Sequence, residues 1–101
     1  MTPSIVLRAP AVVTSRVPFV VTVDVQPVAT RRPISVAVEE KRGAGPASTL
    51  GRLEVTALEG DTAFASFQLA LRERGTVLLL ATAHDHTGSH FHPDGVVVEV
   101  L

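Results

Sequence analysis

Short runs rich in Val, Ile, Leu, Phe and Thr recur about every ten to fifteen residues in this chain, and Pro, Gly, Asp or Ser bounds each run. No stretch keeps an apolar pattern at helical spacing for three turns. The pattern therefore predicts an all-β fold, and about seven strands of this length suit a two-sheet antiparallel sandwich. The predicted strands are residues 4–8 with a continuation at 11–14, then 18–26, 33–40, 50–58, 62–71, 76–85 and 95–101.

Alternation within each run separates an inward face from an outward face, because successive side chains of a strand point to opposite sides of the sheet. Residues 70–75 carry a cluster of charges and are expected to form a loop. The side chains predicted to face an aliphatic core are Phe19, Val21, Val23, Val25, Ile34, Val36, Val38, Leu53, Val55, Ala65, Phe67, Leu69, Leu71, Val77, Leu79, Ala81, Ala83, Val96, Val98 and Val100.

Length and composition limit the class of protein. The chain has 101 residues, and residues 1–101 are expected to form one domain with its own core. The net charge of -1 gives no bulk attraction to nucleic acid or to an anionic membrane, so neither is a predicted partner. The absence of cysteine excludes disulfides, thiolate nucleophiles, zinc–cysteine fingers and the ligand set of blue copper. Without a leader or an 18-residue apolar run, we expect a soluble chain, cytoplasmic if complete and extracellular if it is an excised module.

Three segments carry a resemblance to a known family. They are IVLRAP at 5–10, PFVVTV at 18–23 and GTVLLLATAHD at 75–85. These segments resemble the first, second and sixth strands of bacterial immunoglobulin-like domains, and the resemblance covers about half of the chain. It implies an Ig-like sandwich, commonly an adhesive or spacer module, and implies no catalytic residue. The chain departs from the family pattern at His84, where Thr is usual, and in the further histidines that follow.

All four histidines lie within nine residues, so each arm of a predicted hairpin carries His-x-His. Imidazole is the commonest metal ligand among side chains and titrates near neutral pH. Imidazoles, with help from Asp85 or Asp94, suit Zn(II), Cu(II) or Ni(II) and suit Ca(II) or Mg(II) poorly. The predicted ion is Zn(II) or Cu(II), and the candidate metal ligands are His84, His86, His90, His92 and Asp85.

The register of this hairpin decides whether the histidines meet, and the residues allow three registers. A loop at residues 87–89 pairs the two His-x-His motifs and places all four imidazoles on one face. A two-residue turn at 88–89 instead pairs Asp85 with His92 and sends the two motifs to opposite faces. A third possibility starts the last strand only after residues 92–95, which leaves the histidines in a long loop.

The outer face of the last two predicted strands is partly apolar. A protein partner or a second copy of the chain is the expected occupant of this face, although residues before Phe64 or the connector at 72–74 are an alternative cover. Arg72 and Arg74 of that connector are interpreted as a solvated, charged edge. The candidate interface residues are Leu78, Leu80, Thr82 and Val97.

These observations predict a non-enzymatic binding or assembly module with a transition-metal site on the histidine hairpin. One alternative is a metal-free structural or protein-interaction module, and another use of the histidines is pH sensing through repulsion of protonated imidazoles. A small metalloenzyme domain completed by a partner chain ranks third, because a hairpin at the end of a sandwich is expected to be convex and a catalytic site needs a pocket.

Overall fold

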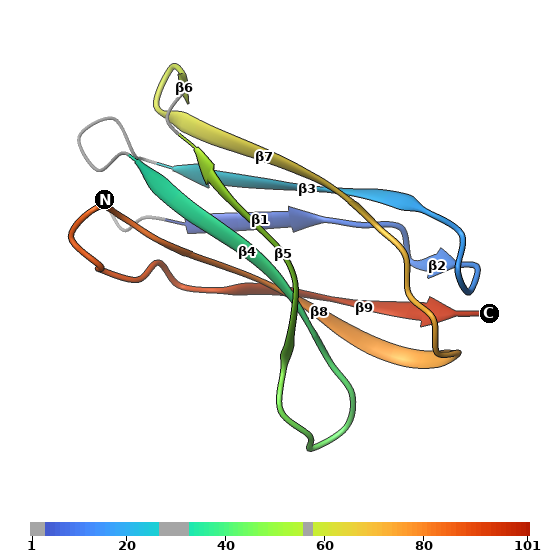
Figure 1. Cartoon of the computed structure of the whole chain (residues 1–101). Coiled ribbons are helices and arrows are strands. Elements are labelled where there is room, and N and C mark those ends of the chain that lie inside the picture. Colours follow the sequence, from blue (N-terminus) through green and yellow to red (C-terminus); the bar gives the residue numbers. More distant parts are fainter. Residues whose placement is uncertain (1–3, 27–32, 56–57) are drawn as a thin grey trace.

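Two facing sheets make up the computed structural model, which describes residues 4–26, 33–55 and 58–101 (Figure 1). This confirms the predicted all-β, two-sheet fold. Within the described residues every strand pair is antiparallel except β2 with β9. The first sheet has the order β1 (Ser4–Arg8), β3 (Phe19–Gln26), β7 (Thr62–Leu69), β6 (Leu58–Glu59). The second has the order β2 (Val12–Val13), β9 (Asp94–Val100), β8 (Gly75–His84), β4 (Ile34–Lys41), β5 (Ser48–Val55).

The strands lie where the alternating pattern placed them, and residues 70–74 form the predicted loop between β7 and β8. One difference concerns the predicted strand at 50–58. The structure ends β5 at Val55 and begins the short β6 at Leu58, which pairs with β7 in the other sheet. Residues 56 and 57 of the prediction lie outside the described residues. No helix long and apolar enough to cross a membrane occurs within the described ranges.

The core lies between the sheets and is formed by the inward residues of the alternation. Leu53 corrects one prediction: it pairs with the buried Val36, yet it is 42% exposed because β5 is an edge strand that the opposite sheet covers only partly. Phe91, from the segment between β8 and β9, is an unpredicted core residue. The largest fully buried side chains are Ile34, Leu71, Leu79, Val21, Val23, Val25, Val36, Val38, Val77, Val98 and Val100.

The beginning of the described chain contributes to both sheets. β1 pairs with β3 in one sheet, whereas β2 pairs with β9 in the other, so the chain crosses between the layers at residues 9–11. Backbone hydrogen bonds fix this crossing: the Glu99 N–H donates to the Ala11 carbonyl and the Leu101 N–H donates to the Val13 carbonyl, both at 2.9 Å. The segment therefore closes the sandwich along one side.

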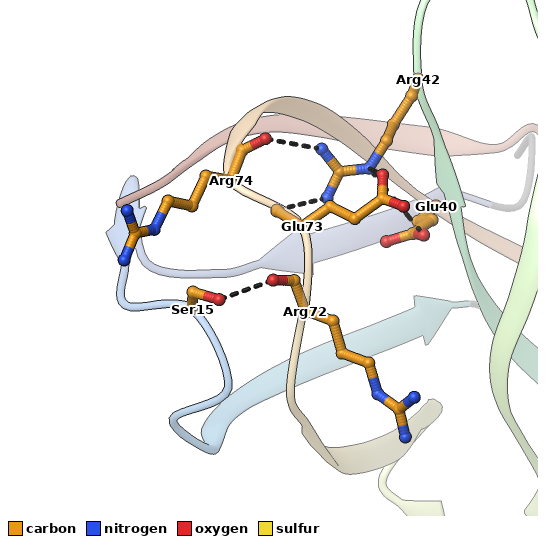
Figure 2. A network of polar contacts seen from close by, with 6 residues as sticks. All are labelled: Ser15, Glu40, Arg42, Arg72, Glu73 and Arg74. Carbon is orange, nitrogen blue, oxygen red and sulfur yellow. Dashed lines mark hydrogen bonds and ion pairs between the residues drawn. The ribbon is translucent and has the colours of Figure 1, made fainter.

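Arg42 holds the loop at residues 70–74, here called the 70–74 connector, against the end of β4 (Figure 2). Its Nη2 donates to the Glu73 carbonyl at 2.8 Å and its Nη1 to the Arg74 carbonyl at 3.5 Å. The Nε atom lies 3.8 Å from the Glu73 carboxylate and 4.0 Å from that of Glu40. One arginine thus satisfies two loop carbonyls and faces two carboxylates.

Candidate functional site

His84 and His90 form the closest pair in the histidine run. His84 is the last residue of β8, and His90 faces it through an isolated antiparallel bridge. Their ring centroids are 5.8 Å apart, with an edge-to-face angle of 62°. Backbone hydrogen bonds from Asp85 N–H to Ser89 and from Phe91 N–H to Ala83 flank the bridge at 3.0 and 2.9 Å. The backbone therefore fixes the two imidazoles side by side.

This register is not one of the first two predicted. The turn at residues 85–88 closes through a hydrogen bond from the Gly88 N–H to the Asp85 carbonyl (3.0 Å), and Gly88 has a φ of +87°. A glycine with positive φ after such a turn is typical of a three-residue hairpin loop, here at residues 86–88, one residue before the predicted loop at 87–89. His84 therefore pairs with His90 instead of His92. The third possibility is not observed either, because β9 begins at Asp94, inside residues 92–95, and His84 of β8 pairs with His90 instead of lying in a loop.

The remaining two histidines lie elsewhere. His86 is an exposed residue of the turn, and His92 forms an isolated parallel bridge with Ser4 of β1. In the ranges 4–26, 33–55 and 58–101, no group of three or more His, Cys, Asp or Glu side chains is arranged to hold a metal ion. Of the predicted ligands, the structure therefore brings together His84 and His90.

The two carboxylates considered as metal ligands, Asp85 and Asp94, accept hydrogen bonds from backbone N–H groups instead. Asp85 is only 6% exposed, and its Oδ1 accepts hydrogen bonds from Thr87 N–H (2.9 Å), Thr87 Oγ1 (2.6 Å) and Ser89 N–H (3.1 Å). An Asp followed two residues later by Thr is a sequence signal for this type of turn. Asp94 accepts a hydrogen bond at Oδ2 from the Leu7 N–H at 2.8 Å.

Beside the histidine pair, the outer face of the second sheet is hollowed. Ala37 of β4 lies opposite Thr82 of β8 and Arg52 of β5, and Ser35 lies opposite His84. Ala37 is only 5% exposed although it lies outside the core cluster, because outer-face side chains surround it. The hollow, here called the histidine hollow, is lined by Ser35, Ala37, Glu39, Arg52, Thr82, Ala83, His84 and His90.

The histidine hollow corrects the expectation that the histidines sit on a convex end of the sandwich. His84 and His90 border a concavity, and Arg52 and Glu39 bring charged groups to the same concavity. Arg52 and Glu39 were not among the predicted site residues, because their position depends on the pairing of β4 with both β5 and β8. The small outward residues Ser35 and Ala37 were the available signal, since small side chains leave space above a sheet.

The separation of the imidazoles fits a shared ion. A metal lies about 2 Å from an imidazole nitrogen, so two rings that share one ion have centroids no more than about 6 Å apart. The observed 5.8 Å meets this condition. Two protein ligands leave the other coordination positions to water, substrate or another chain.

The candidate interface residues lie on the same outer face. Leu78, Leu80 and Thr82 are half-buried, whereas Val97 is 61% exposed. A Cβ atom added to Gly95 would lie 3.1 Å from Leu80 Cδ2 and 3.2 Å from Leu78 Cδ1, so both leucines lean over the backbone of β9. The side chains of Leu78 and Leu80 therefore cover part of the backbone of β9. That a partner binds this face stays a prediction.

No protein-family model matches this chain, and no curated protein matches it in sequence. Solved structures do match. A superoxide reductase (neelaredoxin) from Ignicoccus hospitalis is similar with a TM-score of 0.74 and 21% identity, covering 99% of this chain and 80% of that one. A CARDB domain from Pyrococcus furiosus, in complex with di-metal ions, is similar with a TM-score of 0.66 and 16% identity, covering 98% of this chain and 87% of that one.

These likenesses show the fold. They also correct the predicted function, since the prediction of a non-enzymatic binding or assembly module is overturned by an enzyme, the superoxide reductase, that has this fold over nearly the whole chain. The metal ions of the CARDB domain show that a domain of this fold can bind metal.

Proposed function

We propose that the chain is a small metalloenzyme domain in which His84 and His90 hold one Zn(II) or Cu(II) ion at the edge of the histidine hollow. The observation that carries the proposal is the backbone-fixed pair of imidazoles, 5.8 Å apart between ring centroids, beside a concavity. Imidazole nitrogen suits both ions, and the two similar structures are an enzyme and a domain with di-metal ions.

The histidine hollow supplies the remaining parts of a reactive site. An ion bound there supplies Lewis-acid polarisation or an activated water. Arg52 presents a guanidinium that binds an anionic group of a substrate, and Glu39 presents a carboxylate for proton transfer. The floor of Ala37 and Ser35 leaves room for a small substrate above the sheet.

A catalytic zinc site has three protein ligands, one more than His84 and His90 provide. We propose that a second copy of the chain, packed on the outer face that includes Leu78, Leu80, Thr82 and Val97, contributes the third. The 61% exposure of Val97 on that face supports the proposal. Metal loading is then expected to shift the protein toward a dimer in light scattering after size-exclusion chromatography.

Calorimetric titration with Zn(II) and with Cu(II) tests the metal site. We expect one tight ion per chain or per dimer, a loss of about tenfold or more in affinity for His84→Ala and for His90→Ala, and little change for His86→Ala and His92→Ala. The last two variants remove histidines of the same run that do not line the histidine hollow, so they are matched controls. Equal losses in all four variants, or no tight binding, would overturn the proposed site.

Turnover tests the catalytic part of the proposal. The Zn(II) form is assayed with p-nitrophenyl acetate and the Cu(II) form with superoxide, the compound named by the similar enzyme. Activity is expected to fall in Arg52→Gln while metal affinity stays the same. A protein that binds metal tightly and accelerates neither reaction above free metal would contradict an enzymatic role and leave the metal site standing.

A further inference from the structure

A second site, unrelated to the histidine hollow, is indicated by two arginines near the β7–β8 connection. That connection lies at the opposite end of the sandwich from the β8–β9 hairpin (Figure 1). Arg16 has a φ of +67°, and it is the one non-glycine residue with a positive φ among those that the structure describes. Because L-residues other than Asn and Asp rarely adopt this conformation, an arginine held in it points to a use for its side chain.

Hydrogen bonds bind the turn that contains Arg16 to the 70–74 connector. The Arg16 N–H donates to the Leu71 carbonyl at 2.7 Å. Ser15 Oγ donates to the Arg72 carbonyl at 2.6 Å (Figure 2). The turn itself closes through the Val17 N–H and the Thr14 carbonyl at 3.1 Å. These contacts bring the backbone of Arg16 close to that of Arg72, although the two residues are 56 positions apart in the sequence.

The charges in this region are unbalanced. Glu73, the acidic residue of the connector, faces Arg42, with its carboxylate 3.8 Å from Nε. Within the part of the chain that the structure describes, neither the Arg16 nor the Arg72 guanidinium has an ion pair or a side-chain hydrogen bond. Arg42 shows how an arginine acts structurally here, by binding loop carbonyls, and Arg16 and Arg72 have no such task.

Arg16 and Arg72 line one hollow together with Ala70, here called the arginine hollow. Arg74 does not line this hollow, although it lines a second one that Arg16 and Arg72 also border. In Figure 2 the side chains of Arg72 and Arg74 point to opposite sides of the connector. A guanidinium presents paired N–H donors that match two oxygens of a phosphate or carboxylate, and two guanidinium groups together favour a dianion. We propose that the arginine hollow binds a phosphate group through Arg16 and Arg72.

The experiment titrates the full chain with inorganic phosphate and with a phosphoserine peptide, following backbone amide shifts by NMR at constant ionic strength set with chloride. We expect saturable shifts at residues 14–17 and 70–74, with a Kd below about 10 mM for at least one probe. Tighter binding of inorganic phosphate would identify a small-molecule source, and tighter binding of the peptide would identify a phosphorylated protein.

Arg16→Gln and Arg72→Gln are each expected to weaken binding about tenfold, since each removes a charge-assisted hydrogen-bonding group. Arg74→Gln removes the same charge from the same connector and is expected to change the affinity less than twofold. Circular dichroism tests whether the variants are folded. If Arg16→Gln does not fold, Arg16→Lys takes its place, because it keeps the charge but loses the paired N–H donors of the guanidinium. Equal weakening by Arg74→Gln, or no saturable binding of either probe, would overturn the proposal.

Discussion

The carboxylate of Asp94 in β9 accepts a hydrogen bond from the backbone N–H of Leu7 in β1, with Oδ2 and N 2.8 Å apart. The two strands belong to different sheets, so this bond joins the layers. Because Asp94→Ala leaves the partly buried N–H without its acceptor, we expect the free energy of unfolding to fall by about 1–2 kcal/mol in urea denaturation. Glu54→Ala, which removes an exposed β5 carboxylate, is the control, with an expected change below about 0.5 kcal/mol. Equal losses in the two variants would contradict a specific role for Asp94.

Gly51 of β5 is in close contact with the ring of Phe67, which belongs to the opposite sheet. A Cβ atom added to Gly51 would lie 2.9 Å from Phe67 Cδ1 and 3.3 Å from Cε1. Gly51→Ala therefore forces a buried ring to move, and we expect a loss of about 1–3 kcal/mol in the free energy of unfolding. Gly45→Ala places its Cβ 3.4 Å from the Arg42 carbonyl, an ordinary contact, and serves as the control in the same denaturation experiment. A Gly51→Ala protein as stable as the control would show that the sheets separate easily.

Asp85 stabilises the hairpin that carries the histidines. Asp85→Ala removes the acceptor of three hydrogen bonds at a nearly buried position, and a loss of about 1–3 kcal/mol in the free energy of unfolding is expected. Asp85→Asn keeps Oδ1 as an acceptor and should lose less. Hydrogen exchange at the Thr87 and Ser89 N–H groups is the sharper measurement, because it should accelerate in the alanine variant. Unchanged exchange would show that the turn forms without the carboxylate.

Arg16→Gly is expected to stabilise the protein while it weakens phosphate binding. Glycine adopts positive φ without the penalty of about 1–2 kcal/mol that other L-residues incur, although its greater freedom in the unfolded chain offsets part of this gain. We expect a gain of up to about 1 kcal/mol in thermal or chemical denaturation. Arg16→Lys keeps the strained backbone and should leave the stability unchanged. A destabilised glycine variant would show that the Arg16 side chain itself supports the fold.

The strands and the core were predictable from local information. In β3, the residues Val21, Val23 and Val25 alternate with polar neighbours, and the structure buries all three. Such alternation is visible in a single sequence because it depends on the geometry of one strand. Leu53 shows the limit of this reasoning, because its exposure depends on the place of β5 at the edge of a sheet, and that place depends on which strands pair.

The arrangement of the histidines was not predictable to the same degree. The possibilities considered for the hairpin differ in which residues of the two arms pair, and the local sequence allows each of them. Gly88, with its positive φ, and the hydrogen bonds of Asp85 select the pairing of His84 with His90. Arg52 comes to the same hollow from 32 positions away, through two strand pairings in succession. The alternation within one strand does not show which distant strands pair or in which register.

The pairing of β2 with β9 has a consequence for biosynthesis. A ribosome releases the residues of β2 well before those of β9, yet β2 is an edge strand whose partner in the described sheets is β9. Since domains fold during synthesis as their segments emerge, this side of the sandwich stays open until β9 has left the exit tunnel. Until then, the nascent chain presents an unpaired β8 edge to its surroundings or to a chaperone, and slow translation extends that period.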